Sequence, residues 1–284
     1  MRIVTTAREM TGLAATARAA GGRIGFVPTM GALHEGHLSL VARARAECDE
    51  VVVSIFVNPL QFGPNEDFTA YPRDGERDAA LCHGAGVTTL FAPAEGEIHL
   101  TDHRTWITVA GLEDALCGRS RPGHFRGVAT VVAKLFAIVR PHAAYFGEKD
   151  AQQLRIIRRM VRDLHLDVAV TGCPTVRAPD GLAMSSRNAY LSADERRAAP
   201  VLQRALAAAA MSVRAGETDA ARLVSEVRAA IAAEPLARLD YAEAVDDETL
   251  EPVGEIRRPV LLAVAASFGK ARLIDNVVLQ PLRR

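Results

Sequence analysis

The sequence predicts an α/β protein, in which a Rossmann-like, doubly wound parallel sheet domain is followed by a smaller α+β C-terminal domain. Three observations lead to this prediction. Up to about Val176, short apolar runs alternate with stretches of helical periodicity, which is typical of β-α units. After Arg187 the chain becomes rich in alanine and then in strand-forming residues. Its 284 residues are close to the upper limit of a single core, so we expect domains over residues 1–175 and 176–284.

The predicted parallel strands are short and almost wholly apolar, as expected of strands buried on both faces. They cover residues 25–27, 51–57, 87–91, 144–146 and 168–171. Apolar residues recur with helical spacing from Val128 to Val139 and again from Leu154 to Leu164, which predicts two amphipathic helices. In such a fold, ligands bind at the carboxyl ends of the strands. Polar motifs that directly follow a strand are therefore the candidates for a functional site.

The C-terminal part is predicted to contain two helices and a hairpin. The helices are marked by Leu202, Leu206, Ala209 and Val213, and by Leu223, Val227 and Ile231. The hairpin would pair residues 260–268 with residues 271–278 around Gly269 and Lys270. We expect any hinge between the two domains near residues 174–179.

Charge and composition narrow the classes of function. Lys plus Arg equals Asp plus Glu at 34 each, so no long-range positive field would hold a nucleic acid. No apolar run approaches the roughly 18 residues of a membrane span and no signal-type segment opens the chain, which predicts a cytoplasmic protein without membrane contact. The cysteines are widely spaced, which argues against a zinc site or disulfides and for buried apolar filler at Cys48, Cys82, Cys117 and Cys173.

The first candidate motif reads Pro-Thr-Met-Gly-Ala-Leu-His-Glu-Gly-His over residues 28–37, where a predicted strand ends and a helix begins. A helix start carries free N–H groups and a partial positive charge, so it suits a phosphate. Gly36 allows close approach of the ligand, and His34 and His37 project to the same side. Two imidazoles there would donate hydrogen bonds to an α-phosphate in its transition state. A pair of capping or surface histidines is the alternative.

The second motif comprises Gly147, Glu148, Lys149 and Asp150, directly after the predicted strand at residues 144–146. Lys149 would neutralise phosphate charge, and Asp150 would accept hydrogen bonds from ribose hydroxyls. The turn belongs to the same rim of the sheet as the first motif. Taken alone, such a segment is more often a solvated helix start with a favourable acidic residue.

The third motif comprises Met184, Ser185, Ser186 and Arg187, which follow the turn dipeptide Asp180-Gly181. Two hydroxyls and a planar guanidinium suit the β- and γ-phosphates of a nucleotide. An ordinary polar surface loop is the alternative.

Neutral amides make up the fourth motif. Asn58 and Gln61 follow the predicted strand at residues 51–57, and Gln153 lies at the start of the helix after Lys149. Amides at the carboxyl end of a strand orient a polar substrate without adding charge. Because amides are common in loops, this interpretation depends on the other motifs.

The remaining histidines and carboxylates give no metal site. His124 and His142 are interpreted as structural or turn residues. Neither an H-E-x-x-H motif nor a paired-carboxylate spacing indicates a metal held by the protein. A magnesium ion would arrive with a nucleotide and keep several of its waters.

Together, in this order and at these separations, the four motifs resemble the pantothenate synthetase family, also called the pantoate–β-alanine ligases. The likeness runs from residues 25–37 to the closing strand at residues 271–279. It is densest at Gln61, at residues 71–73 and 122–125, and in the second and third motifs. An H-x-G-H motif alone would indicate only the wider superfamily of nucleotidylyltransferases and class I aminoacyl-tRNA synthetases.

The resemblance implies a role for each motif position. It implies that His37, His34 and Lys149 are catalytic. The implied ATP-binding residues are Met30, Gly31, Ala32, Leu33, His34, Glu35, Gly36, His37, Gly147, Glu148, Lys149, Asp150, Val176, Met184, Ser185, Ser186 and Arg187. Gln61 and Gln153 would bind pantoate, with Gln61 also near β-alanine. Asn58 and Arg121 match positions near the substrates.

The implied reaction is the ATP-dependent condensation of (R)-pantoate with β-alanine to pantothenate, AMP and pyrophosphate, through a pantoyl adenylate. ATP with Mg²⁺, pantoate and β-alanine are the implied small-molecule partners, and a homodimer is the implied assembly. Residues 1–175 would bind ATP and pantoate, and residues 176–284 would form a lid that shields the adenylate from water. Two alternatives stay open: a nucleotidylyltransferase of the same superfamily acting on a phosphorylated acceptor, and a non-catalytic ATP-binding regulator.

Overall fold

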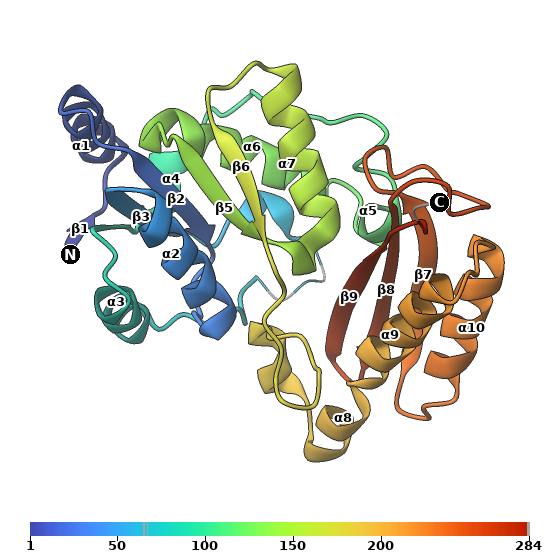
Figure 1. Cartoon of the computed structure of the whole chain (residues 1–284). Coiled ribbons are helices and arrows are strands. Elements are labelled where there is room, and N and C mark those ends of the chain that lie inside the picture. The colour runs from blue at the N-terminus through green and yellow to red at the C-terminus, as the bar shows by residue number, and fades with distance from the viewer. Residues whose placement is uncertain (65, 67, 283–284) are drawn as a thin grey trace. The chain divides into compact units, whose positions relative to one another are not determined.

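The computed structural model describes residues 1–64, 66 and 68–282 and divides into two compact units (Figure 1). The first unit comprises Met1–Glu113, Arg121–Glu148 and Gln153–Pro174. The second comprises Asp114–Ser120, Lys149–Gln152 and the residues from Thr175 onward. Each unit has its own sheet and its own hydrophobic core. The domain limits expected from the sequence stay a prediction.

In the first unit, six strands from the described residues form one sheet in the order β1-β4-β3-β2-β5-β6. The pairings are parallel throughout. The strands are β1 Arg2–Val4, β2 Ile24–Thr29, β3 Glu50–Ile55, β4 Thr89–Phe91, β5 Ala143–Gly147 and β6 Ala169–Cys173. The strand order reverses between β2 and β5, which confirms the predicted doubly wound fold. Ligands bind in such sheets where the order reverses.

Helices of the first part of the chain cover both faces of this sheet (Figure 1). They are α1 Ala7–Ala19, α2 Glu35–Glu47, α3 Gly75–Gly84, α4 Glu95–Ile98, α6 His124–Val139 and α7 Ala151–Asp163, with the 3-10 turns η1 Pro59–Gln61 and η2 Glu148–Asp150. Side chains of β2 alternate between the faces. Val27 lies in a core with Leu40 and Val41 of α2, whereas the Phe26 ring meets Phe136 of α6 edge-on at 6.3 Å.

The observed strands differ from the predicted ones mainly at their ends. The strand predicted over residues 51–57 stops at Ile55, because Asn58 caps the 3-10 turn that follows it. The strand β1 was not predicted, since it has only three residues and two of them are exposed. The apolar face predicted on α6 is observed, with Val128, Leu135 and Val139 all buried.

In the second unit, β7 Arg238–Asp246, β8 Val260–Phe268 and β9 Ala271–Leu279 form an antiparallel sheet in that order. The pairing of β8 with β9 runs up to Phe268 and Ala271, so Gly269 and Lys270 form the tight turn that was predicted. The other elements of this part are α5 Leu116–Ser120, η3 Ser186–Tyr190, α8 Ala193–Ala198, α9 Val201–Arg214 and α10 Ala220–Ala232. This arrangement confirms the smaller α+β part.

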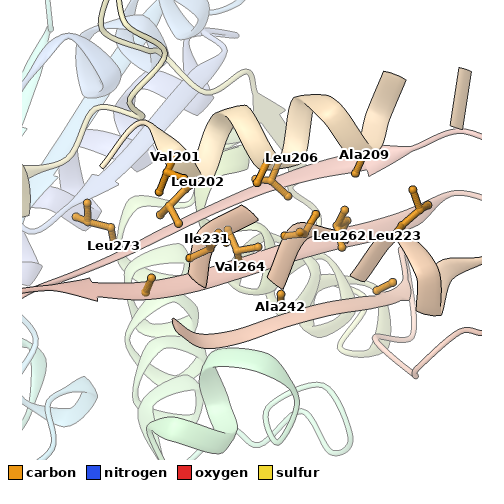
Figure 2. Packing of buried hydrophobic residues seen from close by; sticks show 14 of the residues in the cluster. Val201, Leu202, Leu206, Ala209, Leu223, Ile231, Ala242, Leu262, Val264 and Leu273 are labelled. Carbon is orange, nitrogen blue, oxygen red and sulfur yellow. The ribbon is translucent and has the colours of Figure 1, made fainter. Parts of the chain in front are cut away.

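The core of the second unit forms where α9 and α10 pack on one face of the small sheet (Figure 2). Leu206 of α9 and Ile231 of α10 point toward Leu262 and Val264 of β8, and all four side chains are buried. Burial of each such side chain contributes about 2 kcal/mol. The apolar residues whose spacing predicted α9 and α10 are therefore the ones that cover one face of this sheet.

The cysteines are free thiols, but two of them are not the apolar filler that was predicted. Cys48 is half-buried, with Sγ 3.4 Å from the Tyr145 hydroxyl. Cys117 is buried, with Sγ 3.1 Å from the Tyr241 hydroxyl and 3.5 Å from an Arg272 nitrogen. Sequence spacing argues against a zinc site but does not identify polar neighbours that lie far along the chain.

Across the described chain, none of the helices combines the length and the apolar character that crossing a membrane requires.

Candidate active site

The first motif and the Asn58–Gln61 part of the fourth motif lie at the carboxyl edge of the parallel sheet. β2 and β3 pair in register, with Thr29 opposite Ile55 at their carboxyl ends. β5 pairs with β2 on its other side, so Gly147, the last residue of β5, lies at the same edge. The segments that follow these strands carry the predicted H-x-G-H loop, the Asn58–Gln61 amides and the start of the Gly147 motif. The point between β2 and β5, where the strand order reverses, lies along this edge.

The H-x-G-H loop has an unusual backbone that a buried carboxylate holds in place. Gly31 and Ala32 both have positive φ, at 84° and 50°. The Asp78 carboxylate of α3 accepts hydrogen bonds from the N–H groups of Ala32 and Leu33, each at 2.8 Å. Asp78 is 1% exposed. An alanine in the left-handed region costs about 1–2 kcal/mol, so the two charge-assisted bonds offset the strain of this turn.

Asp78→Asn is expected to weaken both folding and catalysis. An asparagine keeps one acceptor oxygen but turns an NH₂ group toward the second backbone N–H, which is left unsatisfied. We expect the free energy of unfolding to fall by about 1–3 kcal/mol and kcat to fall about tenfold as the loop relaxes. Urea unfolding and steady-state rates would measure the two effects. Glu76→Gln, an exposed change on the same helix, is the control, and equal effects in both variants would contradict the role of Asp78.

The two histidines of the loop cap α2, each through its Nδ1 atom. Nδ1 of His34 accepts from the N–H of Gly36 at 3.1 Å, and Nδ1 of His37 accepts from the N–H of His34 at 3.3 Å. Their ring centroids are 4.1 Å apart. Because Nδ1 is the acceptor in each ring, the proton of each neutral imidazole lies on Nε2. The capping interpretation is therefore correct, and it leaves each ring with an Nε2–H donor.

Of the amides in the fourth motif, Gln61 contacts the H-x-G-H loop and Asn58 contacts Gln61. Asn58 is 1% exposed, and its Nδ2 donates to Oε1 of Gln61 at 3.1 Å and to the carbonyl of Gly127 at 3.2 Å. Nε2 of Gln61 lies 3.0 Å from Sδ of Met30. The structure thus brings Gln61 to the loop that carries the histidines, although the two lie on different strand–helix connections.

Asn58 is fixed in turn by a buried histidine and a lysine that the sequence did not indicate. Nε2 of His99 lies 2.8 Å from Oδ1 of Asn58. On the other side of the ring, Nζ of Lys134 lies 3.2 Å from Nδ1 and donates to the carbonyl of Ile98 at 2.8 Å. Burial, the Lys134 ammonium and His103 together lower the pKa of His99 from 6.5 to about 4. His99 is therefore neutral at neutral pH.

The lowered pKa of His99 predicts a loss of stability in acid. Between pH 6.5 and about 4, the unfolded chain binds a proton at this residue that the folded chain does not, so the free energy of unfolding falls as the pH falls through that range, by at most about 1.4 kcal/mol per pH unit. In His99→Leu this part of the slope should be absent. Urea unfolding at several pH values would compare the variant with His83→Leu, an exposed control. Parallel curves for wild type and His99→Leu would contradict this.

Arg121, predicted near the substrates, is engaged in an ion pair. Its Nε donates to Oε1 of Glu66 at 2.6 Å, and its Nη1 lies 3.0 Å from Nε2 of His124. Burial alone would raise the pKa of Glu66, but the hydrogen bonds and charge of Arg121 lower it. His124 donates from Nδ1 to the carbonyl of Gln61 at 2.8 Å. Both residues thus brace the Gln61 turn, in line with the structural role predicted for His124.

The second motif is divided between the two units. Gly147 and Glu148 belong to the first, Lys149 and Asp150 to the second. The carbonyl of Lys149 accepts a hydrogen bond from Nδ2 of Asn276 at 3.0 Å. The convergence of Lys149 and His37 on one phosphate therefore stays a prediction, as does the role of Gln153, which is half-buried on α7.

The third motif follows a strap that is fastened to the small sheet. We use the name strap for residues 176–184, in which the N–H of Met184 bonds to the carbonyl of Val176 at 2.9 Å. The Arg177 guanidinium bonds to both oxygens of the buried Asp275 in β9, at 2.6 and 2.9 Å. Ser185 then caps η3 by accepting from the N–H of Arg187 at 3.3 Å. Val176 and Met184, two predicted nucleotide-binding residues, are thus brought together.

The polar residues of these networks that were missed from the sequence include Asp78, His99, Lys134 and Asp275. Each acts on a partner far along the chain; the Asp78 contact to Leu33 spans 45 residues. No local motif surrounds them. Only their placement among apolar residues of a helix or strand could have drawn attention to Lys134 and Asp275.

The fold and this edge of the sheet define a nucleotide-binding α/β enzyme. A doubly wound sheet carries two Nε2–H donors at the start of α2, with an amide pair beside them. Such a group suits chemistry at a phosphate next to a polar substrate. The chain belongs to the pantoate–β-alanine ligase family, whose model matches residues 2–278.

Relatives over the whole length bear the same name. A pantothenate synthetase from Heliobacterium modesticaldum is 56% identical over 280 residues, which are 99% of this chain and 100% of the relative. One from Thermotoga neapolitana is 56% identical over 279 residues, 98% of this chain and 100% of the relative. These matches confirm the predicted family and decide for a ligase over a nucleotidylyltransferase or a regulator.

Solved structures agree with the fold. The pantothenate synthetase from Thermus thermophilus is 51% identical with a TM-score of 0.93, over 99% of this chain and 100% of that chain. The pantoate-beta-alanine ligase from Francisella tularensis, described as complexed with beta-gamma ATP and beta-alanine, is 33% identical with a TM-score of 0.78, over 98% of this chain and 97% of that chain.

Proposed function

We propose that the chain joins (R)-pantoate to β-alanine in two steps at the carboxyl edge of its parallel sheet, with ATP converted to AMP and pyrophosphate. Family membership establishes the ligase activity. The ligands named for the Francisella relative support ATP and β-alanine as substrates. The observation that carries the site is the pair of imidazoles, 4.1 Å apart and both protonated on Nε2, beside Gln61.

In the first step, an oxygen of the pantoate carboxylate attacks the α-phosphorus of ATP, and the bond to the leaving pyrophosphate breaks. Adenylation is needed because oxide is a very poor leaving group from a carboxylate. His37 and His34 would donate from Nε2 to the α-phosphoryl oxygens, where charge increases in the transition state. Gln61 and Gln153 would hold pantoate in line with the bond that breaks.

Charge on the departing pyrophosphate would be taken up by Lys149 and Arg187, with Ser185 and Ser186 as hydroxyl donors. Mg²⁺ would enter as the complex with ATP and remain partly hydrated. Met30 to His37, Gly147 to Asp150, and Val176 would line the nucleotide. Asn58 and Arg121 would act close to the substrates, through their contacts with Gln61.

In the second step, the neutral amine of β-alanine attacks the acyl carbon of the pantoyl adenylate, and AMP leaves. The adenylate must be protected from water between the steps. Residues 1–175 would bind ATP and pantoate, and residues 176–284 would serve as the lid. We further propose a cytoplasmic homodimer, as the family resemblance implies.

The two-step route is tested by omitting substrates in turn. ATP–pyrophosphate exchange should require pantoate but not β-alanine, whereas release of AMP should require both. Exchange in the absence of pantoate, or with a phosphorylated acceptor in its place, would overturn the proposal.

A further inference from the structure

We propose that a hydrogen-bond chain from Lys134 through the buried His99 and Asn58 sets the orientation of the Gln61 amide, so that its NH₂ group faces the carboxylic acid substrate. Lys134 and His99 are then positioning residues for pantoate. This rests on the proposed role of Gln61 in binding that substrate. Lys134, His99, Asn58 and Gln61 all belong to the first unit.

The chain begins at an ammonium group, which has three N–H donors and no acceptor. Nζ of Lys134 lies 3.2 Å from Nδ1 of His99, so Nδ1 must be the acceptor. The proton of the neutral ring therefore lies on Nε2. His99 is buried, and its lowered pKa keeps the ring neutral.

The next link fixes the amide of Asn58. With a proton on Nε2, His99 donates across 2.8 Å, and the atom of Asn58 that receives this bond must be its oxygen. The N–H of Leu60 donates to the same oxygen at 3.3 Å. Two donors directed at one position exclude the reversed amide, in which NH₂ would face N–H.

The last link transfers this orientation to Gln61. The NH₂ group of Asn58 points toward Gln61 and the Gly127 carbonyl, at 3.1 and 3.2 Å. Because an NH₂ group only donates, Gln61 must turn its Oε1 toward Asn58. Its own NH₂ group then lies on the side of Met30 in the H-x-G-H loop, 3.0 Å from Sδ.

The two orientations of a glutamine amide have nearly the same shape, so packing alone cannot choose between them. A carboxylate or hydroxyl oxygen of the substrate needs a donor at Gln61, and the reversed amide would offer an acceptor instead. The Lys134 charge favours the donor orientation through two intervening side chains, and it acts together with the Leu60 N–H group and the Gly127 carbonyl, which contact the same Asn58 amide. Loss of any link should weaken binding of the acid while leaving the phosphate groups of the site in place.

Lys134→Met removes the ammonium and keeps most of the side-chain volume. We expect KM for pantoate to rise about tenfold, with kcat and KM for ATP changed less than twofold, because ground-state binding is lost. Lys134→Arg should restore KM to within about threefold of wild type, since a donor is retained. Lys270→Met, in the exposed β8–β9 turn, is the matched control.

A double-mutant cycle identifies the residue through which Lys134 acts. In a Gln61→Ala background, Lys134→Met should not raise KM for pantoate further, because no amide remains to orient. His99→Leu, which breaks the chain at its middle, should reproduce the tenfold rise and should not add to Lys134→Met. Thermal unfolding would check that Lys134→Met folds. If it does not, His99→Leu takes its place as the test of the chain. Long-range ¹H–¹⁵N spectra of His99 should show the Nε2–H form in the wild type.

The outcomes separate this inference from the proposed function. If Gln61→Ala leaves KM for pantoate unchanged, the role of Gln61 is wrong and the inference falls with it. If Gln61→Ala raises KM but neither Lys134→Met nor His99→Leu does, the inference alone is overturned. Equal rises caused by Lys134→Met with and without Gln61 would also overturn it, as would an Nδ1–H form of His99.

Discussion

His37→Ala is expected to slow formation of the pantoyl adenylate by about 10²–10³-fold, the loss found when a transition-state hydrogen-bond donor is removed. The imidazole would donate from Nε2 to an α-phosphoryl oxygen, and alanine offers no substitute. The pantoate-dependent ATP–pyrophosphate exchange rate measures this step alone. His83→Ala, at an exposed histidine of α3, should retain full activity. Near-normal exchange in His37→Ala would contradict the catalytic role.

The capping bond of His37 makes a second variant necessary. His37 accepts from the N–H of His34 at the start of α2, so its loss also destabilises the helix, by about 1 kcal/mol. His37→Glu separates the two effects, because a glutamate at this position forms the same capping box but has no donor for phosphate. It should unfold close to the wild-type temperature while losing at least as much activity as His37→Ala. If His37→Glu is stable and active, catalysis does not depend on the imidazole.

Gly127→Ala is expected to damage both stability and substrate binding. A Cβ atom at Gly127 would lie 2.2 Å from the carbonyl oxygen of Leu60 and 2.8 Å from the backbone nitrogen of Gln61. Backbone atoms cannot swing away as a side chain would, so α6 and η1 must separate. We expect the free energy of unfolding to fall by about 2–3 kcal/mol and KM for pantoate to rise by more than tenfold as Gln61 moves.

Gly12→Ala provides the matched control, because Gly12 lies inside α1 and a Cβ atom added to it would meet nothing within 4 Å. By helix propensity alone, both changes should stabilise the protein by about 1 kcal/mol. Urea unfolding should show a gain for Gly12→Ala and a loss for Gly127→Ala. A gain in both, with unchanged KM, would show that the close approach of α6 to η1 is not maintained in solution.

The fold was largely predictable because burial leaves a regular trace in the sequence. The apolar runs identified β2, β3 and β5, and the spacing of Leu202, Leu206 and Val213 identified α9. β1 was missed because three residues at a sheet edge carry too little pattern. β7 was not delimited, since the charged residues Asp240, Glu243 and Asp246 interrupt its apolar run. Strand ends were less certain because caps, such as Asn58, compete with the strand for the same residues.

The candidate site was predictable only where its residues lie together in the sequence. The H-x-G-H loop and the Asn58–Gln61 turn have recognisable side chains at a strand end. The groups that hold them do not, because Asp78, His99 and Lys134 reach them through space from other helices and connections. Nor does the sequence state which nitrogen of His34 or His37 accepts a hydrogen bond, since that depends on the backbone N–H group that each ring meets in the fold.

If the turn at Gly31 and Ala32 binds the nucleotide as proposed, its left-handed backbone links nucleotide affinity to the stability of the fold. Asp78 holds this turn with two backbone bonds that the chain itself supplies, so the entropy of ordering the turn would be lost on folding and not again when ATP binds. Part of the affinity for the nucleotide would then depend on the ordering of this turn during folding. A homologous chain without this carboxylate would have to order the same turn through its contacts with the nucleotide. It would bind the nucleotide more weakly, even with an identical set of residues around the phosphates.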